Sequence, residues 1–257
     1  MLHRAFVVAL LSSLAFFANS PTAFASPHQH VAHDYESLEE ASRSIQTLSD
    51  ELRALGDRRA LFPAIYAITI SASDRELKKG RFQAPEWTRQ LMINYANLYR
   101  RTIFNELTQQ NQDVPRAWQV AFQYTRRADW SPEVDAVYGI NVHIARDLVE
   151  ALMVTPTDFD NEKMRGDFYF ISDILKSAMP KIWAVFHLYP RALALPSFIE
   201  KQVMTSWIAS LRHRVWMNAK SVRHFPLAKK YEYLDQIDRK AARQARQFGL
   251  LLPLFGE

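Results

Sequence analysis

The chain has 257 residues, of which 48% are hydrophobic and 12% aromatic, so it carries enough apolar surface to fold around its own core. It contains no cysteine, which excludes disulfides, thiolate metal sites and a cysteine nucleophile. The formal net charge of +5 is scattered, so we expect no nucleic-acid partner. The densest basic cluster recurs at helical spacing and predicts a solvated helix face, formed by Arg239, Lys240, Arg243 and Arg246.

The first 25 residues have the organisation of a secretory signal peptide. Arg4 precedes an apolar stretch over residues 5–18, and the small residues Ala23 and Ala25 precede the expected cleavage point. A membrane span needs roughly 20 apolar residues, so a retained anchor is the less favoured alternative. We therefore expect cleavage after Ala25, export to the periplasm or the cell exterior, and no stable membrane span in the mature protein.

The helical periodicity of the apolar residues and the presence of only six glycines predict an all-α, single-domain bundle of about eight helices over residues 37–250. Residues 26–36 are expected to be a flexible leader that contains histidines, and residues 251–257 a C-terminal tail. In chain order, helices are predicted at residues 37–55, 58–79 and 85–107, then from residue 115, and at residues 131–154, 167–189, 197–222 and 227–248. We expect the longest internal loop at residues 155–165 and a kink at Pro180.

The fifth predicted helix carries the densest group of polar side chains. His143 and Asp147 are four residues apart, so they can touch on a regular helix. An imidazole beside a carboxylate suits a metal site, a general base that the carboxylate orients, or an ordinary exposed ion pair on an amphipathic helix. Gly139, one turn earlier, leaves room beside the imidazole for a ligand or another helix. Asn141 falls among apolar positions, where an unpaired amide would cost roughly 1 to 3 kcal/mol.

Four segments form a recognisable series along about residues 55–225. They are Val114-Pro115-Arg116-Ala117-Trp118, Gly139-x-Asn141-x-His143-Ile144-x-x-Asp147-Leu148, Asp167-Phe168 and Arg212-x-x-x-Trp216. In these segments and their order the chain resembles the domain of unknown function 5995 family, from whose pattern it departs at Val142, where alanine is expected. The resemblance implies a helical fold and no particular reaction. It also implies that one site gathers Asn141, His143, Asp147, Asp167 and Arg212.

One hypothesis is therefore an exported hydrolase with a polar pocket. Its candidate catalytic residues, which are also the candidate ligands of a divalent metal such as zinc, are His143, Asp147 and Asp167. Its candidate substrate-binding residues are Asn141, Arg212 and Trp216. Arg212 could reach a buried carboxylate such as that of Asp147 or Asp167 bidentately, either as part of this site or in a purely structural ion pair.

A second hypothesis is a non-enzymatic envelope protein that binds a small apolar ligand in an aromatic-lined cavity. The side chains expected to line it are Trp87, Tyr95, Trp118, Tyr138, Phe168, Trp183 and Trp216. Aromatic residues at helical spacing are also typical of a plain core, in which case the polar residues would form a purely structural network. A polar, metal-competent pocket would favour the enzyme, an apolar and roomy one the binding protein, and a closed core the structural network.

Overall fold

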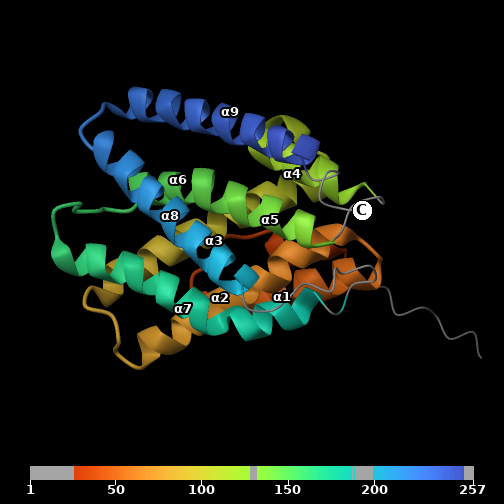
Figure 1. Cartoon of the computed structure of the whole chain (residues 1–257), viewed down its shortest axis with the longest axis horizontal. Coiled ribbons are helices and arrows are strands. Elements are labelled where there is room, and N and C mark those ends of the chain that lie inside the picture. Colours follow the sequence, from red (N-terminus) through yellow and green to blue (C-terminus); the bar gives the residue numbers. More distant parts are fainter. Residues whose placement is uncertain (1–25, 128–131, 187, 189–198, 252–257) are drawn as a thin grey trace, which may run out of the picture.

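The computed structural model describes residues 26–127, 132–186, 188 and 199–251, and its elements are helical throughout this part of the chain (Figure 1). The described residues contain no β-strand, so the predicted all-α fold is confirmed for them. The expected signal peptide, residues 1–25, and residues 252–257 of the expected tail lie outside the described residues. Among the described helices, none combines the length and the apolarity that crossing a membrane requires.

Helix bounds agree with the predicted ones to within three residues, apart from one boundary. The helices are α1 (Leu38–Ala54), α2 (Leu61–Lys78), α3 (Pro85–Leu107), α4 (Arg116–Thr125), α5 (Pro132–Val142), α6 (Leu148–Val154), α7 (Glu162–Phe186), α8 (Ile199–Ser221) and α9 (Leu227–Leu251). A π-helical turn, His143–Asp147, joins α5 to α6, so these three segments together form the fifth predicted helix. We call them the central rod.

The exception is the start of α7, which lies five residues before the predicted position. The side-chain oxygen of Asn161 accepts hydrogen bonds from the backbone N–H groups of Lys163 and Met164, at 2.9 and 3.2 Å. Asparagine in this position satisfies N–H groups that the first helical turn leaves unpaired. The predicted loop over residues 155–165 is therefore shorter and ends at this cap, and α7 continues through Pro180 to Phe186.

Residues 26–36, predicted to be a flexible leader, instead pack against the domain. Pro27–Val31 form a 3-10 helix, and the side chains of Val31 and Tyr35 are buried. The guanidinium of Arg100 on α3 donates a hydrogen bond of 2.7 Å to the carbonyl oxygen of Val31. The prediction was wrong because these two apolar side chains, set in a polar stretch, have a complementary surface that only the folded α1 and α3 provide.

The central rod runs through the middle of the bundle (Figure 1). It contacts α2, α3, α4, α8 and α9. In Figure 1, α9 lies above the rod, and α1, α2 and α7 lie below it. A rod covered on several sides must bury even those side chains that point away from its apolar stripe, and His143 and Asp147 are consequently buried. The alternative of an exposed ion pair on an amphipathic helix is therefore wrong.

The last helix, α9, is amphipathic and packs against α4. Its buried side chains include Leu234, Ala241, Ala242 and Ala245. The basic residues of the cluster that the sequence predicts to be solvated are all exposed on α9, namely Arg239, Lys240, Arg243 and Arg246. Their position confirms the predicted solvated helix face.

Candidate functional site

The site begins with the π turn in the central rod. The backbone N–H of Leu148 donates to the carbonyl oxygen of His143, five residues earlier instead of four. Such single π turns inside α-helices occur frequently at functional sites. The additional residue rotates the following segment by roughly 100° relative to a regular helix. The faces that a regular helical wheel assigns to α6 therefore do not continue those of α5.

His143 is held by Asp147 at the other end of this turn. Its Nδ1 lies 3.0 Å from Oδ2 of Asp147, so the contact predicted from their spacing is confirmed. Burial lowers the pKa of His143 below its ordinary value, and this effect outweighs the opposing hydrogen bond and charge of Asp147. The imidazole is therefore neutral at pH 7, and facing the carboxylate it carries its proton on Nδ1. The lone pair on Nε2 is left to act as a base or an acceptor.

Asp147 is fully buried and accepts three hydrogen bonds. Its Oδ2 accepts from Nδ1 of His143 and, at 2.8 Å, from Nε1 of Trp118, while its Oδ1 accepts from Nη1 of Arg146 at 2.8 Å. The same Nη1 of Arg146 also donates a hydrogen bond to Oε2 of Glu150, at 2.6 Å. Burial by itself raises the pKa of Asp147, but the hydrogen bond to His143 and the charge of Arg146 outweigh it and lower the pKa. The carboxylate is therefore charged and fixed in place.

Aromatic rings enclose the imidazole of His143. The ring of Tyr95 stacks on it with a centroid distance of 3.7 Å and an interplanar angle of 9°. Tyr66 meets it edge-on at 4.4 Å. More distant rings belong to Phe62, Tyr99 and Trp118, at 5.3, 5.9 and 6.2 Å. This packing fixes the orientation of the ring, and Nε2 of His143 has no hydrogen-bond partner among the described residues.

Gly139 allows one of these rings to approach the central rod. A Cβ atom at this position would lie 2.7 Å from Cδ2 and 2.8 Å from Cγ of Phe62. Real Cβ atoms do not approach carbon this closely, so any larger residue would displace the phenyl ring. The room beside the imidazole that the sequence predicts is thus occupied by a side chain of α2, another helix.

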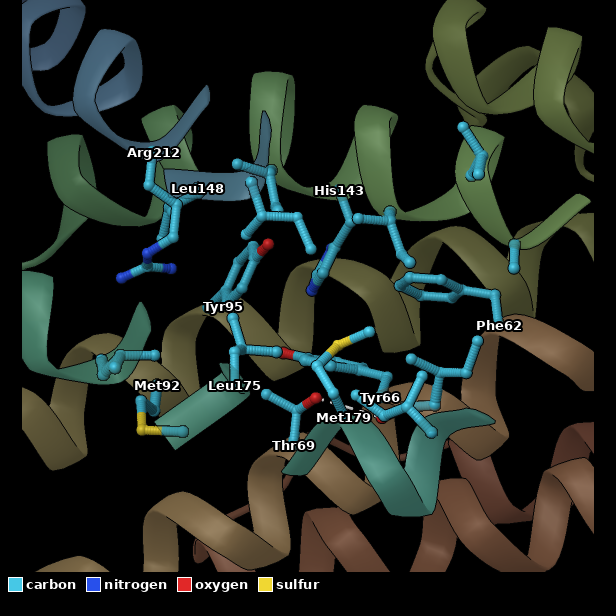
Figure 2. Close-up of a pocket in the computed structure, with 18 of the residues that line it drawn as sticks. Phe62, Tyr66, Thr69, Met92, Tyr95, His143, Leu148, Leu175, Met179 and Arg212 are labelled. Atoms are coloured by element: carbon cyan, nitrogen blue, oxygen red, sulfur yellow. Dashed lines mark hydrogen bonds between the residues drawn. The ribbon is translucent and has the colours of Figure 1, made fainter. Parts of the chain in front are cut away.

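A cavity with a volume of about 80 Å³ lies beside His143, between the central rod and α2, α3, α7 and α8 (Figure 2). Most of its lining is aliphatic or aromatic. The side chains with polar atoms that line it are Tyr66, Thr69, Tyr95, His143, Trp183 and Arg212. Three of these atoms are buried and have no hydrogen-bond partner among the described residues: Nε2 of His143, Oη of Tyr95 and Nε1 of Trp183.

Arg212 of α8 also lines the cavity and is 3% exposed. Its Nε donates to Oγ of Ser172 at 3.0 Å and its Nη2 to the carbonyl oxygen of Phe168 at 2.6 Å. The prediction that it reaches Asp147 or Asp167 is wrong, because both of its hydrogen-bond acceptors in the described part of the chain are neutral. Burial lowers the pKa of Arg212 to about 10. The guanidinium thus remains charged at pH 7.

The carboxylate of Asp167 accepts hydrogen bonds at the start of α3, and Asp167 does not line the cavity. Its Oδ1 accepts from the backbone N–H of Gln83 at 2.9 Å, and its Oδ2 from that of Ala84 at 2.6 Å. Among the described residues there is no group of three or more histidine, aspartate or glutamate side chains that can hold a metal ion. The predicted metal set of Asp167 with His143 and Asp147 is therefore wrong, since the oxygens of Asp167 are committed to the helix N-terminus.

Two more candidate residues lie away from the cavity lining. Trp216 is 2% exposed and belongs to the core, where it packs against the rings of Phe159 and Phe168, with centroid distances of 5.0 and 4.9 Å. Asn141 is half-buried on α5. The structure thus brings two of the candidate residues to the cavity, His143 and Arg212, and places Asp147 behind His143.

The aromatic lining expected from the sequence is correct in part. Tyr95 and Trp183 line the cavity, whereas the other aromatic residues expected there do not: Trp87, Trp118, Tyr138, Phe168 and Trp216. The sequence reasoning also missed Tyr66 and Thr69, which line the cavity from α2. Their spacing of three residues on a mostly apolar helix was the available signal, because it places two hydroxyl groups on neighbouring positions of one face.

Comparison with known proteins identifies the family of this chain. The model of a family described as "Family of unknown function (DUF5995)" matches residues 38–250, which include α1 to α8 and all of α9 except its last residue. No curated protein and no solved structure gives a significant match. Because the match covers most of the chain, from α1 to the last turns of α9, the protein belongs to the DUF5995 family.

Proposed function

We propose that the chain binds a small, mainly apolar molecule in the cavity beside His143. The observation that carries this proposal is a set of three buried polar atoms around one apolar cavity, on His143, Tyr95 and Trp183, none of which has a hydrogen-bond partner in the described part of the chain. Leaving a buried polar atom unpaired costs about 1 to 3 kcal/mol. A bound molecule that offers hydrogen-bonding groups to these atoms recovers part of that free energy. Small-molecule sites commonly combine an apolar lining with a few placed polar groups.

The size of the cavity limits the ligand. An apolar cavity of about 150 Å³ is large enough for benzene, whereas this one has a volume of about 80 Å³. The ligand is therefore compact, or the lining moves when it binds. Met92 and Met179 line the cavity, and methionine side chains adapt easily to a changed shape. Leu175 also lines it and is half-buried, so it lies where the cavity approaches the surface.

Calorimetric titration with neutral primary alcohols, from propanol to octanol, tests this proposal. The wild-type protein is expected to bind one molecule per chain. Leu175→Trp fills the cavity and is expected to abolish binding. Leu107→Trp is the matched control, since Leu107 is also half-buried but lies at the end of α3 and outside the cavity lining. Absence of saturable binding of every alcohol to the wild-type protein would contradict the proposal.

A second candidate function is hydrolysis of the bound molecule, with His143 as general base. Nδ1 of the neutral imidazole is held by a carboxylate, and its Nε2 has no hydrogen-bond partner among the described residues, so it can take a proton from water. This arrangement favours the candidate. In this reading Asp147 orients the base. Small esters of p-nitrophenol test it: the wild-type protein is expected to hydrolyse them and His143→Gln to lose this activity. Equal rates in the two proteins would eliminate the candidate.

Export of the chain is also part of the proposal. Residues 1–25 would direct the protein to the periplasm or the cell exterior and be removed after Ala25, so that the 3-10 helix Pro27–Val31 begins near the new N-terminus. The burial of Val31 against the domain is compatible with cleavage a few residues before it. Amino-terminal sequencing of the protein from separated cell fractions should find Ser26 first. Full-length protein confined to the cytoplasm would be the opposite result.

A further inference from the structure

Arg212 differs from the other buried or half-buried arginines of the described chain. The others each pair with a carboxylate: Arg58 with Asp135, Arg59 with Asp57, Arg100 with Asp34 and Arg146 with Asp147. Arg212 is more deeply buried than any of them, yet the described part of the chain provides it with no carboxylate. A buried charge is costly unless an opposite charge compensates it. Because Arg212 lines the cavity, a negatively charged group of a bound molecule can supply the missing opposite charge there.

Two hydrogen bonds and one aromatic ring fix the guanidinium of Arg212 in place. Its Nε and Nη2 donate to Ser172 and Phe168, which fixes the plane of the group, and Nη1 donates to no group among the described residues. The ring of Phe168 supports it from one face, with the guanidinium carbon 4.4 Å from the ring centroid. A planar guanidinium that is fixed in this way is suited to a carboxylate, which it can bind through parallel hydrogen bonds.

Arg212 and His143 contribute to the same cavity, and Tyr95 lies between them (Figure 2). One part of the cavity thus offers a cation, and another a neutral imidazole enclosed by aromatic rings. Between them the lining is mostly apolar. A ligand that matches this distribution has one negatively charged group and a short apolar body.

We infer that the molecule bound in the cavity is a compact monocarboxylate, whose carboxylate pairs with Arg212 and whose apolar part fills the cavity toward His143. This inference rests on the proposed binding function and specifies the ligand class. Linear monocarboxylates from propionate to octanoate, titrated calorimetrically beside the alcohols of the same chain length, test it. The carboxylate is expected to bind at least about tenfold more tightly than the matching alcohol, which corresponds to about 1.4 kcal/mol.

Variants assign this preference to Arg212. Arg212→Met keeps an unbranched side chain without the charge, and it is expected to remove the preference for the carboxylate over the matching alcohol. Arg214→Gln is the control, since Arg214 is exposed on the same helix. If Arg212→Met does not fold, Arg212→Lys takes its place: it keeps the charge but loses the planar fork, and is expected to weaken carboxylate binding more than alcohol binding.

The outcomes separate this inference from the binding function on which it rests. Binding of alcohols without any preference for carboxylates overturns the inference and leaves the binding function intact. If neither alcohols nor carboxylates bind, the inference and the proposed binding function are both wrong. A carboxylate preference that Arg212→Met retains, or that Arg214→Gln loses equally, also overturns the inference, because the charge responsible would then lie elsewhere. Carboxylate binding that Arg212→Lys does not weaken overturns it as well, because the planar guanidinium would then not be the group that holds the carboxylate.

Discussion

Replacing Asp147 with asparagine tests whether this carboxylate organises the π turn. The carboxylate accepts hydrogen bonds from Trp118, His143 and Arg146. An amide offers one accepting oxygen and a donating NH₂ group. If its oxygen takes the place of Oδ2, the hydrogen bonds from Trp118 and His143 survive. The NH₂ group then faces Nη1 of Arg146, a distance of 2.8 Å in the wild-type protein, so two donors oppose each other.

The expected loss of stability is about 3 kcal/mol. A hydrogen bond that involves a charged group contributes about 1.5 to 3 kcal/mol, and removing one partner of a buried ion pair costs about 3 to 5 kcal/mol. Arg146 keeps its contact with Glu150 at 2.6 Å, so the lower end of the second range applies. In a domain of this size each kcal/mol shifts Tm by about 2 to 4 °C, and Tm is therefore expected to fall by about 6 to 12 °C.

Urea denaturation followed by tryptophan fluorescence measures this loss. The matched control is Glu150→Gln, which removes a second carboxylate that contacts Arg146; the side chain of Glu150 is 16% exposed. The control is expected to lose less than Asp147→Asn, because Arg146 then keeps the fully buried carboxylate of Asp147 and the hydrogen bonds from His143 and Trp118 are untouched. If Asp147→Asn destabilises the protein no more than Glu150→Gln does, Asp147 does not organise the turn as we describe.

Two further predictions concern the surroundings of His143. Gly139→Ala should destabilise the protein, because the new Cβ atom must displace the ring of Phe62, at a cost of about 1 to 3 kcal/mol. The higher helix propensity of alanine returns at most about 1 kcal/mol. An increased urea midpoint would contradict the close packing of Gly139 against Phe62. The lowered pKa of His143 means that the unfolded chain binds more protons between the folded pKa and about 6.5, its unfolded value. The stability contributed by this group is fully present above about pH 6.5 and is lost as the pH falls through that window. His143→Asn should therefore flatten the dependence of the unfolding free energy on pH below about 6.5, and an unchanged slope would disprove the assignment.

Most helix bounds could be predicted because their signals are local in the chain. Ser37 accepts a hydrogen bond of 3.1 Å from the backbone N–H of Glu40 at the start of α1. Gly56 and Gly80 follow α1 and α2 with φ of 70° and 68°, a conformation in which glycine is favoured. Pro85 occupies the first turn of α3. The contact of His143 with Asp147 is local in the same sense, since residues four apart meet on neighbouring turns.

The tertiary structure alone decided the roles of the more distant candidates. Arg212 binds Ser172, 40 positions away in the sequence, and Asp167 binds the backbone of Gln83, 84 positions away. Residue types and spacing indicated that Arg212 and Asp167 have polar partners, but the partners depend on which helices become neighbours. The sequence did not predict the π turn, because a helical wheel with a regular step of 100° assumes that no residue is inserted into the helix.

Burial of the candidate site was also decided at the tertiary level. The apolar pattern of residues 131–154 shows which face of the rod must leave water, and it places His143 and Asp147 on the opposite side. A polar face can lie in solvent or beneath another helix, and its own sequence does not distinguish the two. In the folded chain α2 and α3 cover His143 with Tyr66 and Tyr95, and this coverage lowers its pKa and places it beside an apolar cavity. The sequence by itself therefore determined the helices and the His143–Asp147 pair, whereas packing between distant helices determined the chemical environment in which the pair acts.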